Sequence, residues 1–130
     1  MDKKKSILIV DDYPILREEL QSLLSTHQDF CVLGGAEDGL EAIEFVGKLQ
    51  PDLVLMDISM PRMNGLDATR NIKKKWPETK ILVFTVYHSY DTAAIKAGAD
   101  GYILKDASRN ELIQSIENIF PENQALGFNC

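Results

Sequence analysis

Five polar side chains of this 130-residue chain each stand at the end of a short apolar run. They are Asp11, Asp12, Asp57, Thr85 and Lys105. Apolar runs this short are typical of strands that are buried on both faces of a parallel sheet. Because strand ends of one kind lie along one edge of such a sheet, we expect three carboxylates, a hydroxyl and an ammonium to meet there. That set of groups could hold a divalent cation beside a phosphoryl group.

The chemistry of this edge follows from its charges. Three carboxylates brought together repel one another unless a cation neutralises them. Mg²⁺ prefers oxygen ligands and is bound by one or two carboxylates together with phosphate oxygens and water. A carboxylate can also act as a nucleophile and form an acyl phosphate. Lys105 would then neutralise the phosphoryl group from the side opposite the cation, and Thr85 would donate a hydrogen bond to it.

The rest of the chain alternates between strand-like and helix-like patterns. The predicted strands cover about 6–10, 30–36, 52–56, 80–85 and 101–104, and the predicted helices begin near Pro14, Asp38, Asn64, Ser89 and Ser108. Glu111 lies three residues after Ser108, which is the spacing of a capping box. This alternation predicts an α/β fold with a doubly wound parallel sheet and helices on both faces. Ligands of such folds bind beyond the carboxyl ends of the strands, which selects the same edge again.

Composition and charge narrow the function classes. The net charge of −6 disfavours direct binding of nucleic acid by this domain. No apolar stretch approaches the roughly 20 residues that span a bilayer. We therefore expect an intracellular protein that does not bind membranes. Cys31 lies in a strand-like stretch, so we expect it to be a small buried hydrophobe and not the partner of Cys130 in a disulfide.

The motifs around these residues resemble the receiver domain of two-component response regulators over residues 6 to about 119. The matching pieces are Ile-Val-Asp11-Asp12, Leu-Met-Asp57-Ile-Ser-Met-Pro61-Arg-Met-Asn-Gly65, Val-Phe-Thr85 and Ala-Gly98-Ala-Asp-Gly-Tyr102-Ile-Leu-Lys105-Asp106. The last piece is most similar to the subgroup with a LuxR-type helix-turn-helix output domain. The resemblance implies a five-stranded flavodoxin-like sheet with strand order 2-1-3-4-5. It also implies a receiver domain over 1–120, followed at 121–130 by a tail or the start of a linker to an absent output domain.

The resemblance implies a role for each acidic residue. Asp57 would accept a phosphoryl group from a histidine of a sensor kinase. Asp12 would ligate Mg²⁺ directly and Asp11 would do so mostly through water. The backbone carbonyl of Ser59 would be a further ligand, beside the carboxylate of Asp57.

Other matched positions would carry the signal. Lys105 would pair with the phosphoryl oxygens, and Thr85 and Tyr102 would form a switch that remodels the face made by the fourth helix, the fifth strand and the fifth helix. Ser59 and Tyr87 would control the access of water and hence the lifetime of the acyl phosphate. The chain would thus be a signalling switch and not an enzyme, although it would assist its own phosphorylation and dephosphorylation.

The resemblance also implies partners and a location. The partner would be a sensor histidine kinase, with a second copy of the chain as a candidate for a homodimer, and the location would be cytoplasmic. We favour a truncated chain over a natural single-domain protein. Control of transcription would then pass through a missing DNA-binding domain.

One spacing departs from the resemblance. The stretch from Thr85 to Gly98 is about two residues shorter than is usual, close to the ~10–12 residues that a crossover needs. We expect a shortened fourth helix of about two turns, or a rearranged loop.

Three other functions stay open at this point. One is a docking module that works without phosphorylation, which the shortened crossover suggests. Another is a Mg²⁺-dependent phosphatase of the haloacid-dehalogenase kind, whose first strand should end in Asp-x-Asp, whereas this one ends in Asp11-Asp12-Tyr13. A flavin-binding module is weaker, because the two acidic groups would repel phosphate at the first turn.

Overall fold

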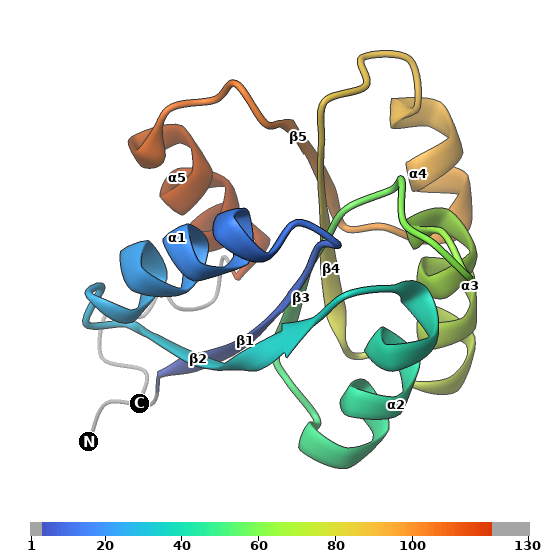
Figure 1. Ribbon diagram of the computed structural model, residues 1–130, viewed down its shortest axis with the longest axis horizontal. Helices are drawn as coiled ribbons and strands as arrows, with labels where there is room; N and C mark the ends of the chain where they lie inside the picture. Colours follow the sequence, from blue (N-terminus) through green and yellow to red (C-terminus); the bar gives the residue numbers. More distant parts are fainter. Residues whose placement is uncertain (1–3, 121–130) are drawn as a thin grey trace.

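The computed structural model describes residues 4–120, and within these residues five strands alternate with five helices (Figure 1). The strands are β1 (Lys5–Val10), β2 (Phe30–Ala36), β3 (Leu53–Met56), β4 (Lys80–Thr85) and β5 (Gly101–Leu104). The helices are α1 (Pro14–Ser25), α2 (Gly39–Leu49), α3 (Gly65–Lys75), α4 (Asp91–Ala97) and α5 (Arg109–Ile119). All strand pairs are parallel, in the order β2-β1-β3-β4-β5. The predicted doubly wound sheet is confirmed.

Helices cover both faces of this sheet (Figure 1). The helices α1 and α5 pack on one face, and α2, α3 and α4 pack on the other. Successive side chains of a strand point to opposite faces. In β1, Ile7 and Ile9 therefore pack with α1 and α5, whereas Leu8 and Val10 pack with the other layer. All four are buried, which explains why the central strands are apolar without alternation.

Polar side chains begin three of the helices at the carboxyl edge of the sheet. Asp38 accepts a hydrogen bond from the Glu41 N–H at the start of α2. Asn64 does the same for α3. Ser108 and Glu111 form the predicted capping box of α5. These caps satisfy backbone N–H groups that a helix leaves unpaired in its first turn.

The predicted short fourth helix is confirmed, because α4 has seven residues. It begins at Asp91, two residues later than predicted. Residues 86–90 form a loop before this helix. In this loop the rings of Tyr87 and Tyr90 meet edge to face with centroids 5.4 Å apart. The hydroxyl of Tyr102 on β5 also donates a hydrogen bond to the carbonyl of Tyr87.

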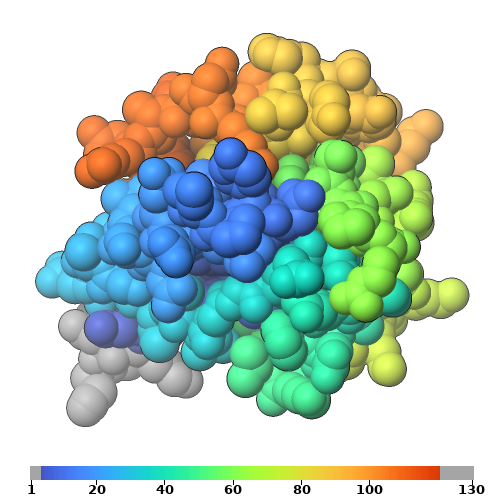
Figure 2. Space-filling model, in the orientation of Figure 1, coloured from blue at the N-terminus to red at the C-terminus, as the bar shows by residue number. Residues whose placement is uncertain are grey.

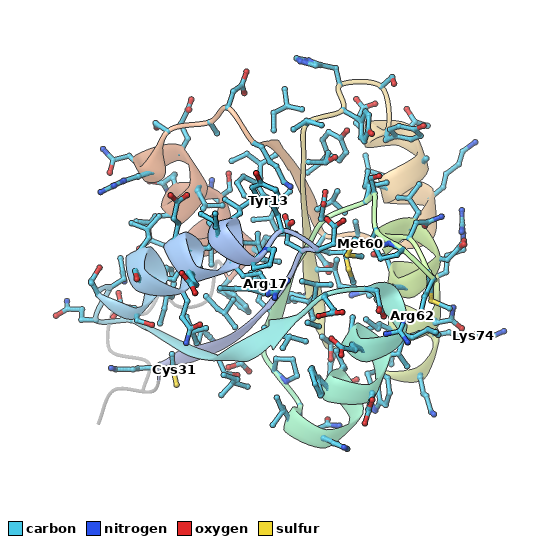
Figure 3. All side chains as sticks on the ribbon, in the orientation of Figure 1. Tyr13, Arg17, Cys31, Met60, Arg62 and Lys74 are labelled. Atoms are coloured by element: carbon cyan, nitrogen blue, oxygen red, sulfur yellow. The ribbon has the colours of Figure 1, made fainter. Side chains whose placement is uncertain are left out.

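Cys31 is exposed, so the expectation of a buried cysteine is wrong. The strand β2 forms one edge of the sheet, and its burial alternates along the strand. Phe30 is 3% exposed and packs with the α1 and α5 layer, whereas Cys31 points the other way, toward solvent (Figure 3). Cys130 lies outside the described residues.

Helix length and polarity also bear on membranes. Within residues 4–120, none of the helices is both long and apolar enough to cross a bilayer.

The helix α3 approaches the end of β3 so closely that its first residue must be glycine. A Cβ atom added to Gly65 would lie 1.8 Å from the carbonyl oxygen of Asp57. The N–H of Gly65 donates to the carbonyl of Ile58 at 2.8 Å, which closes the loop between β3 and α3. The start of α3 and the backbone of Asp57 therefore form one tightly packed unit.

We expect Gly65→Ala to lower the free energy of unfolding by about 2–4 kcal/mol, because α3 must move away from β3 to make room for the methyl group. Urea denaturation measures the change. Gly47→Ala in α2 is the matched control: there the added Cβ would meet the Trp76 ring at 3.2 Å, and alanine improves helix propensity, so the net change should stay within about 1 kcal/mol. Equal losses in both variants would contradict the explanation.

Candidate functional site

The carboxyl edge of the sheet brings the predicted site residues together, because β1, β3, β4 and β5 lie side by side (Figure 1). Figure 2 shows the blue segment after β1 meeting the green, yellow and orange segments that follow the other three strands. Asp11 and Asp12 directly follow β1, and Asp57 directly follows β3. Thr85 is the last residue of β4, and Lys105 directly follows β5. The parallel pairing of the strands places these ends side by side.

Three carboxylates form the centre of the site. One oxygen from each of Asp11, Asp12 and Asp57 lies within 4.8 Å of the other two. Asp57 is 6% exposed and Asp11 is 2% exposed, whereas Asp12 is open to solvent. This cluster, which we call the acidic pocket, therefore extends from the buried Asp57 and Asp11 to the exposed Asp12.

Lys105 joins two of these carboxylates. Its Nζ donates to Oδ2 of Asp11 at 2.7 Å and lies 3.3 Å from Oδ2 of Asp57. Burial alone would lower the pKa of Lys105, but the hydrogen bond to Asp11 and the charge of Asp57 outweigh burial and raise this pKa above its usual value. The lysine is therefore a firmly protonated cation. Its backbone N–H also donates to the carbonyl of Thr85 at 2.8 Å, which aligns β5 with β4.

The surroundings of Asp57 disfavour the ionised form of its carboxyl group. Burial and the negative charge of Asp11 raise the pKa of Asp57 to about 6. The charge of Lys105 and a 2.8 Å hydrogen bond from the Ile58 N–H act in the opposite direction and only partly offset this rise. A further cation in the pocket would stabilise the ionised form. Near neutral pH, Asp57 is thus a poorly solvated carboxylate, which suits a nucleophile.

Asp11 is fixed by hydrogen bonds at its backbone and its side chain. Its N–H donates to the carbonyl of Ala36 at 3.0 Å, and its Oδ1 accepts from the N–H of Tyr13 at 3.0 Å. Arg17 of α1 donates through Nη1 to the carbonyl of Asp11 at 2.5 Å (Figure 3). Gly35 of β2 leaves room for this arginine, because a Cβ there would lie 3.1 Å from Cδ of Arg17. Arg17 was not predicted as a site residue, because helical periodicity carries no signal for such a contact.

The remaining predicted residues surround the pocket. Thr85 is fully buried, and its Oγ1 accepts a weak hydrogen bond of 3.4 Å from the N–H of Tyr87. The hydroxyl of Tyr102 donates to the carbonyl of the same residue, Tyr87. Ser59 is exposed in the loop after β3, two residues beyond Asp57. The backbone of Tyr87 therefore connects Thr85 with Tyr102.

A protein-family model described as "response regulator receiver domain" matches residues 7–117. The chain belongs to the response regulator receiver domain family. A curated relative of this receiver domain is the transcriptional regulatory protein DegU of Brevibacillus brevis, which is 39% identical over 118 residues, covering 89% of this chain and 50% of DegU. The nitrate/nitrite response regulator protein NarL of Escherichia coli K12 is 41% identical over 113 residues, covering 85% of this chain and 52% of NarL. The receiver domain thus spans about half the length of these relatives.

Solved structures agree with this assignment. A LuxR-family two-component response regulator from Aurantimonas sp. SI85-9A1 has a TM-score of 0.88 and 34% sequence identity, covering 92% of this chain and 87% of that one. The predicted family, its LuxR-type subgroup and the flavodoxin-like fold are confirmed. The phosphatase and flavin alternatives are set aside.

The raised pKa of Asp57 predicts that Asp57→Asn stabilises the metal-free receiver domain at pH 7.5. The folded state binds the proton of Asp57 more tightly than the unfolded chain, where the pKa is near 3.8, so the free energy of unfolding falls as pH rises from about 4 to about 6. Above that range the penalty is constant, and asparagine removes it. We expect a gain of about 1–3 kcal/mol at pH 7.5 that shrinks toward pH 4.

Urea denaturation with a chelator present, at several pH values, measures this gain. Glu78→Gln is the control, because it removes one exposed negative charge outside the pocket. A gain for Asp57→Asn that is the same at pH 4.5 and pH 7.5 would contradict the claim that ionisation of Asp57 lowers the free energy of unfolding.

Proposed function

We propose that this receiver domain accepts a phosphoryl group on Asp57 from a phosphohistidine of a sensor kinase. The observation that supports this most is the pocket itself, in which Asp57 lies beside two carboxylates and 3.3 Å from the ammonium of Lys105. In the transfer, an oxygen of Asp57 forms a bond to phosphorus while the P–N bond to the histidine breaks. The electron pair of that bond leaves with the imidazole, which takes up a proton, and Asp57 becomes an acyl phosphate.

The ligand set of the pocket fits Mg²⁺. It consists of carboxylate oxygens, which a small hard cation prefers. We propose that Asp12 and Asp57 are direct ligands, that the backbone carbonyl of Ser59 is a further ligand, and that Asp11 acts mostly through water. The indirect role of Asp11 agrees with its side-chain oxygens, which already bind Lys105 and the Tyr13 N–H. When bound, Mg²⁺ would neutralise negative charge on the phosphoryl oxygens.

Lys105 would provide the second positive charge for the transferred group. It already lies between Asp11 and Asp57, so it can follow the phosphoryl oxygens after the transfer without crossing the pocket. The domain would thereby assist its own phosphorylation and dephosphorylation, while acting as a switch and not as an enzyme. Ser59 and Tyr87 stand two residues beyond Asp57 and Thr85, where their side chains would control the access of water and the lifetime of the acyl phosphate.

We propose that Thr85 and Tyr102 form the switch. The hydroxyl of Thr85 would turn to a phosphoryl oxygen and give up the N–H of Tyr87. Because the hydroxyl of Tyr102 donates to the carbonyl of Tyr87, a shift of the loop 86–90 would also move the side chain of Tyr102 on β5. The face made by α4, β5 and α5 would change, since a new dianion biases an element that has two arrangements.

The output of the switch is proposed from the relatives. DegU is named as a transcriptional regulatory protein, and we propose that residues 1–120 act as the receiver of such a regulator. Residues 121–130, which lie outside the described part of the chain, would begin the linker to a DNA-binding output domain. A domain with net charge −6 suits this division, because contact with DNA would fall to the output domain. A homodimer and a cytoplasmic location, without membrane contact, complete the proposal.

Acetyl phosphate with Mg²⁺ tests the phosphoacceptor. We expect the wild type to gain the mass of one phosphoryl group and Asp57→Asn to gain none. Asp67→Asn, which changes an exposed aspartate at the start of α3, should label like the wild type. Labelling that persists in Asp57→Asn would move the acceptor elsewhere. A wild type that takes up no phosphate would favour docking without phosphorylation as the role of this fold.

Tyr102→Phe tests the switch separately from the chemistry. It removes the hydrogen bond to the Tyr87 carbonyl and leaves the ring, so labelling of Asp57 should stay within about twofold of the wild type. The change that beryllofluoride causes in the amide exchange of residues 86–97 should become smaller. Tyr13→Phe, at an exposed tyrosine before α1, is the control. An unaltered response in Tyr102→Phe would exclude this hydroxyl from the switch.

A further inference from the structure

An ion pair outside the acidic pocket connects the loop after β3 with the start of α2. Asp38 is 1% exposed, and its Oδ1 caps α2 by accepting from the Glu41 N–H at 2.9 Å. Its Oδ2 accepts from Nε of Arg62 at 2.8 Å and also from Nη2 of the same guanidinium. The Glu41 N–H lowers the pKa of Asp38, burial raises it, and the bonds to Arg62 lower it further, so that the net shift is downward. The buried carboxylate is therefore charged and held from two sides.

A backbone contact runs parallel to this ion pair. The N–H of Gly39 donates to the carbonyl of Met63 at 2.9 Å. A Cβ atom on Gly39 would lie 2.7 Å from the same oxygen, so only glycine permits this approach. Residues 38 and 39 are thus joined side by side to residues 62 and 63, and Figure 3 shows Arg62 lying against the start of α2.

The backbone of Arg62 has an unfavourable conformation that these contacts stabilise. Its φ is 64°, in the left-handed region that residues with side chains seldom adopt. This conformation directs the arginine toward Asp38, and the next residue donates its N–H to the carbonyl of Pro61 at 2.7 Å. The two ends of the loop 58–64 are joined by the bond from the Gly65 N–H to the Ile58 carbonyl. Ser59 therefore lies in a loop whose ends are tied together and whose second half is held by the side chain of Arg62.

We propose that Arg62 is a positioning residue for the cation site: by binding Asp38 it holds the loop 58–64 so that the backbone of Ser59 faces the pocket. This inference rests on the function proposed above, in which the carbonyl of Ser59 is a ligand. Arg62 acts through the loop and touches no reacting atom. Its charge is matched by that of Asp38, so its influence on the pocket is geometric and not a long-range field.

The test is the affinity for Mg²⁺, measured by isothermal titration calorimetry, together with the rate of labelling by acetyl phosphate over a range of Mg²⁺ concentrations. Removing a group that orients a ligand weakens metal binding, and we expect Arg62→Ala to raise the Kd for Mg²⁺ about three- to tenfold. At saturating Mg²⁺ the labelling rate should return to within about twofold of the wild type, because the phosphoacceptor itself is intact. A defect that saturating Mg²⁺ does not relieve would overturn the proposal.

Three further variants separate the explanations. Arg62→Gly suits the left-handed backbone and lacks the guanidinium, so it should lose affinity as Arg62→Ala does. Arg62→Lys keeps the charge but not the forked donor, so its Kd should fall between the wild type and Arg62→Ala. Arg70→Ala removes the same charge from an exposed pair with Asp67, at 2.5 Å on α3, and should match the wild type.

An unchanged Kd in Arg62→Gly, with the wild type binding Mg²⁺ and accepting phosphate, would show that the turn alone places the loop and would overturn the proposal. An equal loss in Arg70→Ala would show a general effect of charge and would overturn it too. A wild type that neither binds Mg²⁺ nor takes up phosphate would instead overturn the proposed function. If Arg62→Ala does not fold in a thermal melt, Arg62→Lys supplies the comparison.

Discussion

The arrangement of the acidic pocket depends on the ammonium group of Lys105, which lies between the buried carboxylates of Asp11 and Asp57. Parallel pairing of β1 with β3 places Asp11 and Asp57 next to each other, and both are removed from water. Lys105 lies within 3.3 Å of both carboxylates and supplies a single positive charge against them. With the exposed Asp12 beside them, negative charge remains in excess, and the raised pKa of Asp57 shows the effect. A cation bound among these carboxylates would stabilise the ionised form of Asp57.

The rest of the fold keeps this unfavourable arrangement in place through backbone carbonyl groups. Arg17 binds the carbonyl of Asp11, and the N–H of Lys105 binds the carbonyl of Thr85. Gly65 brings α3 against the carbonyl of Asp57. In each case a group from another element of the fold fixes the main chain beside an acidic or polar side chain. Such contacts act on the main chain, so they hold the carboxylates close together in spite of their mutual repulsion.

The parts that could be predicted from the sequence are those determined locally. The apolar run before Asp57 identifies a buried strand, and the carboxylate after it identifies the edge. Ser108 and Glu111 show their capping box in the spacing alone. Strand order came from the family resemblance, because periodicity does not say which strands are neighbours. With that order, the meeting of Asp11, Asp57 and Lys105 follows.

The features that escaped prediction depend on how different elements are arranged in the fold. Arg17 and Arg62 act through long side chains whose targets no local pattern reveals. Cys31 is exposed because β2 lies at the edge of the sheet. The sequence of β2 does not distinguish an edge strand from an inner strand. The start of α4 is displaced because Tyr102, from the next strand, holds the loop before it.

The shortness of α4 has a thermodynamic consequence. Seven residues are well below the ~12–15 that a helix needs to persist alone. Its buried side chains are the small ones of Ala94 and Ala97, while Ile95 is 67% exposed. This helix therefore contributes little to the global cooperativity of folding and forms a weakly coupled subglobal unit on a stable sheet. The gain or loss of a single hydrogen bond, worth about 1 kcal/mol, would suffice to redistribute its conformers while the core stays folded.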